Sequence, residues 1–120
     1  MKVTRYEPGP RFAQVVAVGE WIFLAGQVAG DPSQPVDNQA EQIFKEIDRL
    51  LKKVGSDKRH LVSVNVYLAD ISDFPAMNAV WDKWIAHDAM PVRATVETRL
   101  AATQYRIEIQ ATAVRKEGAQ

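Results

Sequence analysis

Hydrophobic and polar residues alternate along two stretches near the C-terminal end of the chain. In residues 92–99 the apolar positions are Val92, Ala94 and Val96, and the polar positions are Arg93, Thr95, Glu97 and Arg99. In residues 107–113 the apolar positions are Ile107, Ile109, Ala111 and Ala113, and the polar positions are Glu108, Gln110 and Thr112. A period of two predicts strands with one apolar and one polar face. If the two strands share a core, Arg93 and Glu108 lie on a common polar face.

Three further strands are predicted earlier in the chain. Residues 12–18 and 20–25 are short apolar-rich runs joined at Gly19, which indicates a hairpin after a turn-rich start at residues 8–10. The third strand covers residues 61–69. Its inward positions are predicted to be Val62, Val64, Val66 and Leu68, opposite Ser63, Asn65 and Tyr67.

The clearest helix lies in the middle of the chain. Its apolar residues recur at spacings of three and four and are Ala40, Ile43, Phe44, Ile47, Leu50, Leu51 and Val54. Asn38 or Asp37 is the candidate N-cap, with Glu41 three residues after Asn38 in the capping-box position. Gly55 is well placed to end this helix in a left-handed conformation.

A shorter helix is predicted after Ser72, its candidate N-cap, with Pro75 in the first turn. Its apolar positions are Phe74, Met77, Val80, Trp81, Trp84 and Ile85. Both helices are apolar on one side only, so each needs a sheet face to cover. The order β-β-α-β-α-β-β therefore predicts an α+β two-layer sandwich with both helices on one face of the sheet.

The other face of that sheet is predicted to be mixed. Either Trp21 with Phe23, or Ile22 with Leu24, must point away from the helices, beside Tyr67. A partly apolar second face favours burial against another copy of the chain. We therefore expect a homo-oligomer with a pocket between subunits.

Composition narrows the classes of function. A chain of 120 residues predicts a single domain over residues 1–120, with residues 116–120 as a flexible tail. Fifteen basic and fifteen acidic residues cancel, so bulk charge favours neither nucleic acid nor an anionic membrane as partner. The absence of cysteine excludes disulfides and thiolate sites. No apolar run reaches the length of a membrane span or a signal peptide, so we expect a cytoplasmic, metal-free protein.

Few side chains remain as candidates for chemistry. His60 and His87 follow a turn and a helix end, and we interpret both as surface or capping residues. Arg93 can hold a carboxylate by two parallel hydrogen bonds without losing its charge, and Glu108 can position or deprotonate a water molecule. Such a pair suits hydrolysis of a small, already electrophilic substrate. The alternative interpretation is an ordinary solvated sheet face.

Four segments together resemble the RidA (YjgF-like) family. They are residues 91–97 (PVRATVE), 106–113 (RIEIQATA), 23–28 (FLAGQV) and 73–78 (DFPAMN). The resemblance is collinear over about residues 5–115. The sequence of residues 77–84 (MNAVWDKW) is most similar to that of the divergent YoaB-like branch of the family.

The resemblance implies a fold similar to chorismate mutase and a homotrimer with three interface clefts. It also implies an enamine/imine deaminase without cofactor or metal, which hydrolyses 2-iminoacids derived from 2-aminoacrylate to 2-oxoacids and ammonia. By the same resemblance Arg93 would bind the substrate carboxylate, the backbone of Thr95 and Gly26 would line the cleft, and Glu108 would hold the water.

The sequence departs from the family pattern at several positions. After the early Gly-Pro, where archetypal members carry a tyrosine, this chain has Arg11 and Phe12; Phe12 is expected to pack on the substrate, but it donates no hydrogen bond. Thr95, Gln110 and Ala101 replace the usual cysteine, glutamate and proline. The missing tyrosine keeps open a second function, a non-catalytic module that binds small carboxylates in the same cleft. Zero net charge argues against a ribonuclease or translation inhibitor, and trimer formation would cover the apolar surface that a holdase chaperone needs.

Overall fold

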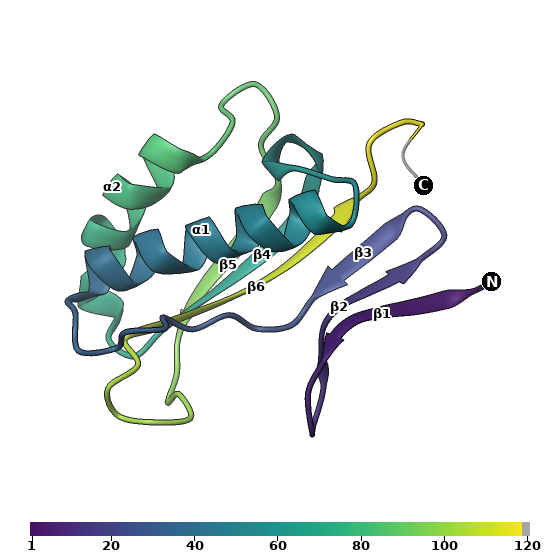
Figure 1. Cartoon of the computed structure of the whole chain (residues 1–120). Coiled ribbons are helices and arrows are strands. Elements are labelled where there is room, and N and C mark those ends of the chain that lie inside the picture. Colours follow the sequence, from purple (N-terminus) through teal and green to yellow (C-terminus); the bar gives the residue numbers. More distant parts are fainter. Residues whose placement is uncertain (119–120) are drawn as a thin grey trace.

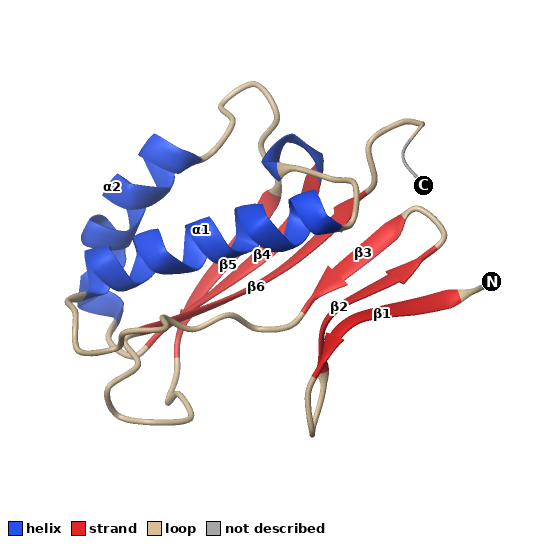
Figure 2. Ribbon diagram, in the orientation of Figure 1, coloured by secondary structure: helices blue, strands red, loops and turns tan. Residues whose placement is uncertain are grey.

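The computed structural model describes residues 1–118 as one six-stranded sheet with two helices on one side of it (Figures 1 and 2). The strands are β1 (Val3–Pro8), β2 (Ala13–Val18), β3 (Trp21–Leu24), β4 (Leu61–Leu68), β5 (Val92–Glu97) and β6 (Ile107–Val114). The helices are α1 (Val36–Lys53) and α2 (Phe74–Trp84), and short 3-10 turns precede β4 (Lys58–His60) and α2 (Ile71–Asp73). The predicted α+β two-layer class is confirmed.

The sheet is mixed, in the order β1-β2-β3-β6-β4-β5. Only β4 and β5 are parallel, because α2 carries the chain back to the same end of the sheet between them. The other neighbours pair antiparallel. Because β5 comes last in the strand order, it is an edge strand, with one side of its backbone free of strand partners within the described sheet.

One strand, β1, was not predicted. Its residues form an edge strand in which Val3 pairs with Val18 and Tyr6 with Val15. None of its side chains is fully buried, so the sequence shows no clean apolar alternation there. Backbone pairing with β2, packing of Tyr6 on the core and ion pairs from Glu7 to α1 hold this segment in place. The observed order is therefore β-β-β-α-β-α-β-β.

The apolar stripe of α1 is buried as predicted, and Gly55 has φ +79° just after the helix. The predicted N-caps Asp37 and Asn38 are wrong, because α1 begins at Val36, before both of them, with Pro35 at the N-cap and no side-chain cap.

Gln39, in the first turn of α1, connects the start of the helix to neighbouring loops. It is fully buried, and its Nε2 lies 2.9–3.1 Å from the carbonyl oxygens of Pro32, Gln34 and Gln104. Its Oε1 accepts from the backbone N–H of Arg106. One side chain therefore joins the start of α1 to two loops.

Two further local predictions are wrong. Ser72 does not cap α2, because an extra 3-10 turn precedes the helix and Asp70 caps that turn by accepting from the Ser72 N–H. Val62 is 37% exposed and Leu61 is buried in its place, because a bulge shifts the register between Leu61 and Ser63.

The face of the sheet away from the helices is mixed, as predicted. Ile22 and Leu24 point toward the helices and are buried, so Trp21 and Phe23 point outward, 46% and 43% exposed. On the far edge Val92 and Val96 are also exposed. Polar residues of β4 and β6 lie between these two apolar flanks: Ser63, Asn65, Tyr67, Glu108, Gln110 and Thr112.

Contacts with the segment after α1 hold the start of the predicted flexible tail. Lys116, in the predicted flexible tail, donates its backbone N–H to the Gly55 carbonyl and forms an ion pair with Asp57. Residues 119 and 120 of that tail lie outside the described part.

Within residues 1–118, neither helix is long and apolar enough to cross a bilayer.

Candidate functional site

Arg93 lies on the helix side of the edge strand β5. It pairs in register with Val64, which is buried beneath the helices, and paired residues of neighbouring strands share a face. Its guanidinium carbon lies 4.8 Å from the centre of the Trp81 ring and 5.7 Å from that of Phe74, and Nη1 lies 3.9 Å from the sulfur of Met77. Cation–π contacts and apolar packing therefore hold this guanidinium in place.

No carboxylate pairs with Arg93 among residues 1–118. Burial lowers the pKa of Arg93, and the more distant charge of Asp82 opposes that shift. Arginine nevertheless keeps its charge in proteins. The result is a half-buried cation held by rings, with its hydrogen-bonding capacity for an anion unused.

Thr95 accompanies Arg93 on the same face. It pairs with the buried Val66, and its hydroxyl oxygen is buried without a hydrogen-bond partner in the described part of the chain. A buried hydroxyl without a partner is costly, so it is the kind of group that a bound ligand would satisfy.

Glu108 lies on the other face of the sheet. It pairs with Tyr67, three residues after Val64 on β4, and an odd spacing along a strand reverses the side. Its carboxylate rests against Gly26 so closely that a Cβ at residue 26 would overlap it. Glycine at position 26 is therefore required for the observed position of Glu108.

A hollow of about 670 Å³ brings together three of the predicted site residues, Phe12, Gly26 and Glu108. A smaller hollow of about 270 Å³ on the same face shares Gly26 and Glu108 and adds Arg99 and Gln110. Glu108 thus borders two adjoining spaces on the open face of the sheet.

The expectation that Arg93 and Glu108 share a face of one chain is wrong. Alternation assigns the two sides of each strand correctly, but it does not say which side of β5 is turned toward the helices. Here β5 turns Arg93 and Thr95 toward the helices and exposes Val92 and Val96. In a single chain the predicted site residues therefore form two groups, Arg93 with Thr95, and Glu108 with Gly26 and Phe12.

Sequence reasoning overlooked two residues of the open face. Tyr105 lines the larger hollow, as Glu108 does, and Arg99 lines the smaller one, beyond the end of β5. Tyr105 precedes β6 and belongs to no alternating pattern, so no periodicity could have indicated it. Alternation predicts Arg99 as a polar position of the strand, but β5 ends at Glu97, so the pattern does not indicate a place in the smaller hollow.

The remaining candidates have structural contacts. His60 Nδ1 lies 2.7 Å from Asp57 Oδ1, and His87 Nε2 lies 2.7 Å from the backbone oxygen of Asp82 just before the end of α2. Both histidines therefore fit the predicted surface and capping roles. Across the described residues, no three His, Cys, Asp or Glu side chains are grouped as metal ligands.

A family model described as endoribonuclease L-PSP matches residues 3–115 of the chain. The chain belongs to the RidA (YjgF-like) family. Among its relatives is a RutC family protein of Haemophilus ducreyi, 38% identical over 92% of this chain and 95% of that protein. The RutC family protein YoaB of Escherichia coli is 32% identical over 94% of this chain and 98% of its own length.

A human member named 2-iminobutanoate/2-iminopropanoate deaminase is 33% identical over 88% of this chain and 80% of its own. Among solved structures, a Neisseria meningitidis member of the YjgF family superimposes with a TM-score of 0.94 at 38% identity, over 97% of each chain. The RidA fold expected from the sequence is therefore confirmed.

Proposed function

We propose that this RidA-family protein is an imine deaminase that hydrolyses reactive 2-iminoacids to 2-oxoacids and ammonia. The observation that carries the proposal is the Arg93 guanidinium, which is half-buried and fixed over Trp81 and Phe74 without a carboxylate partner in residues 1–118. A planar carboxylate is the group that an unused, immobilised guanidinium binds best.

The active cleft is proposed to form between two copies of the chain. Arg93 and Glu108 lie on opposite faces of one sheet, but β5 is an edge strand and can approach the Glu108 hollow of a second copy. The exposed flanks on the open face, Trp21 with Phe23 and Val92 with Val96, supply apolar area for that contact. Closed repetition of one such heterologous contact three times gives a homotrimer.

In this cleft Arg93 would hold the carboxylate and so fix the imine carbon beside the water next to Glu108. Glu108 would accept a proton as the water oxygen bonds to that carbon and the C=N bond becomes a single bond. That proton then returns to the nitrogen, which gives a carbinolamine. A second transfer through Glu108 moves the hydroxyl proton to the nitrogen as the C–N bond breaks and the C=O bond forms, so the products are a 2-oxoacid and ammonia. The name of the human relative, 2-iminobutanoate/2-iminopropanoate deaminase, supports this assignment by similarity.

A second function, binding of small carboxylates without turnover, is favoured by Phe12, which is 59% exposed and brings no hydroxyl to the hollow. The Tyr105 phenol lines the same hollow and offers the missing donor, which favours the deaminase.

The deciding experiment generates 2-iminopropionate with an amino-acid oxidase or a dehydratase and follows ammonia and 2-oxoacid release. Catalysis is expected with the wild-type protein and is expected to be slower by about 10²–10³-fold in Arg93→Ala. Saturable binding of pyruvate without any acceleration would favour the binding module. Equal turnover by Arg93→Ala would disprove the carboxylate clamp.

The proposed assembly and the expected absence of a nucleic-acid partner are tested separately. Sedimentation equilibrium is expected to give three chains per particle, and a stable monomer would remove the cleft between copies. With equal numbers of acidic and basic residues, RNA affinity is expected to be weak. Tight, steeply salt-dependent RNA binding would contradict that expectation.

A further inference from the structure

The smaller hollow on the open face of the sheet contains a charge that the proposed reaction does not use. It has a volume of about 270 Å³, and Tyr67, Arg99 and Glu108 are among the residues that line it. The Arg99 side chain is exposed and forms no hydrogen bond or ion pair with any residue from 1 to 118, Glu108 included. An unpaired guanidinium therefore borders the same space as the proposed catalytic carboxylate.

The end of β5 places Arg99 next to this space. The strand ends beside Leu68, the last residue of β4, and the backbone N–H of Thr98 donates to the Leu68 carbonyl at 2.9 Å. Tyr67, the residue before Leu68, pairs with Glu108 on β6. The segment that carries Arg99 is therefore fixed at its start to the strand that lies between it and Glu108.

The two hollows beside Glu108 differ in character. The larger one has Phe12 and Phe23 in its wall, which are the kind of exposed apolar side chains that a second copy would cover. The smaller one has Arg99 and Tyr67, whose hydroxyl makes no hydrogen bond within residues 1–118. A charged group of a substrate therefore fits the smaller hollow better than the larger one.

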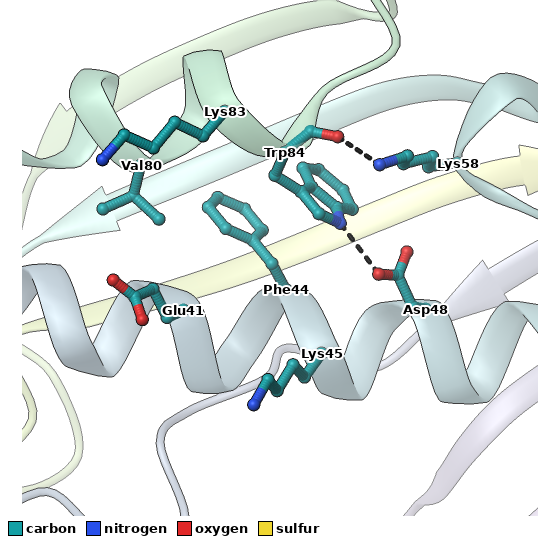
Figure 3. A pocket seen from close by; sticks show the side chains of 8 residues that line it. All are labelled: Glu41, Phe44, Lys45, Asp48, Lys58, Val80, Lys83 and Trp84. Carbon is teal, nitrogen blue, oxygen red and sulfur yellow. Dashed lines mark hydrogen bonds between the residues drawn. The ribbon is translucent and has the colours of Figure 1, made fainter.

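The hollow between α1 and α2 is different, because its side chains bond to one another (Figure 3). The Phe44 and Trp84 rings stack with centroids 4.3 Å apart. The Trp84 Nε1 donates to Asp48 Oδ2 at 3.0 Å, and the Trp84 backbone oxygen accepts from Lys58 Nζ. Contacts within the chain account for those residues, whereas no contact within residues 1–118 accounts for the Arg99 guanidinium.

We propose that Arg99 selects substrates with a second carboxylate, so that the preferred 2-iminoacids are dicarboxylic, as 2-iminosuccinate is. This inference rests on the proposed deaminase function. Arg93 of one copy would hold the carboxylate next to the imine carbon. Arg99, in the copy that supplies Glu108, would hold the carboxylate at the far end of the substrate side chain through parallel N–H donors. A cleft with two arginines and one glutamate carries a net positive charge, which favours a dianion.

The test compares two substrates that differ in charge and hardly in shape. An amino-acid oxidase converts aspartate to 2-iminosuccinate and asparagine to its amide, 2-iminosuccinamate, and the rate of 2-oxoacid release is measured above the uncatalysed rate. In wild type, kcat/KM for the dianion is expected to exceed that for the amide by about threefold to tenfold, as for a carboxylate held by one exposed arginine. Arg99→Gln is expected to remove this preference by slowing turnover of the dianion alone.

Two further variants control for charge and position. Arg99→Lys keeps the positive charge and is expected to retain part of the preference. Arg5→Gln is the matched control, because Arg5 pairs with Val16 and so lies on the same face, but it lines neither hollow. Both substrates are expected to react with Arg5→Gln as they do with wild type.

Binding of the products separates this inference from the proposed reaction. By calorimetry, wild type is expected to bind oxaloacetate more tightly than 2-oxosuccinamate, and Arg99→Gln to bind the two equally. Turnover without a preference for the dianion, or a preference that survives in Arg99→Gln, would overturn the role of Arg99 and leave the deaminase standing. Absence of all imine turnover would overturn the deaminase, and the calorimetry alone would then decide, since equal binding of both oxoacids to wild type would overturn the role of Arg99 as well.

Discussion

Two arginine–glutamate pairs of this protein differ in whether the fold of one chain brings their charges together. Arg49 of α1 donates through Nη1 and Nη2 to the two carboxylate oxygens of Glu7, both at 2.9 Å, and through Nε to Glu46 at 2.7 Å. Arg93 and Glu108 lie on opposite faces of the sheet, and neither has an ion-pair partner within residues 1–118. Folding therefore forms an ion pair between Arg49 and Glu7, and it leaves Arg93 and Glu108 apart and unpaired within residues 1–118. We call the first pair closed and the second pair open.

The difference separates a structural charge from one available for a ligand. Hydrogen bonds from Arg49 and then from Lys53 lower the pKa of Glu7 to about 2, so this carboxylate is already saturated by its neighbours. The pKa of Arg93 is also lowered, but for a cation this shift disfavours the charged form; its cause is burial, because the rings beneath Arg93 remove water without supplying a negative charge. A cation in that condition gains most from an anion that arrives from outside.

The largest expected effect follows from removing the open cation. In Arg93→Ala, kcat/KM for imine hydrolysis is expected to fall about 10²–10³-fold, because two charge-assisted hydrogen bonds to the carboxylate are lost. Arg93→Lys is the matched control. It keeps the positive charge but loses the two parallel N–H donors of the guanidinium group, and it should retain an intermediate rate. The comparison between the two pairs would fail if Arg49→Ala reduced turnover as strongly as Arg93→Ala.

A smaller effect is expected at the open carboxylate. Gly26→Ala places a methyl group where the Glu108 carboxylate lies, so the acid must move and turnover is expected to fall by about tenfold or more. Gly30→Ala is the control, because a Cβ there meets nothing within 4 Å and its φ lies outside the left-handed region. Steady-state kinetics and a thermal melt of both variants check this, and equal rates would show that the position of Glu108 does not matter.

The rings that hold Arg93 are expected to contribute less. Phe74→Leu removes one cation–π contact at 5.7 Å, worth about 0.5–1 kcal/mol, so KM is expected to rise about twofold to fivefold. kcat is expected to change little, since the substitution does not alter Glu108 or the proposed position of the attacking water. A fall in kcat at constant KM would mean that Phe74 acts on the chemical step rather than on Arg93.

The closed pair is expected to affect stability alone, through pH. The folded pKa of Glu7 is lowered, so its stabilising contribution is present above its ordinary pKa of 4.5 and is lost as the pH falls through about 2. Glu7→Gln should therefore be slightly less stable than wild type at neutral pH, and the two denaturation midpoints should converge between pH 4.5 and 2. A constant difference down to pH 2 would contradict the assignment, and imine turnover at neutral pH should be unchanged.

The covered face of the sheet could be predicted well, because burial under helices leaves a strong periodic signal. The spacing of Ile43, Ile47 and Leu50 and the glycine at 55 were enough to place α1. Features held by backbone pairing or by one extra residue left no such signal. The edge strand β1 and the bulge that turns Val62 outward are both of this kind.

The identity of the candidate site residues could be predicted from the sequence, but their positions relative to one another on the sheet could not. Strand alternation and side-chain chemistry single out Arg93 and Glu108, and the family resemblance assigns a role to each. Because β4 separates β5 from β6, the relation between the sides of those two strands depends on register across a third strand, which no local pattern contains. Tyr105 was missed for a related reason, since a loop residue joins a hollow through tertiary structure alone.

Gln39 has a consequence for how this protein can change during evolution. Its amide fixes Gln104 and Arg106, at the end of the same loop that brings Ala101 and Tyr105 to the Glu108 hollow. That loop is therefore anchored from inside the core, on an amide that has no exposed surface. New ligand preferences are more accessible by exchanging side chains along the loop, such as Ala101, than by altering its path or length.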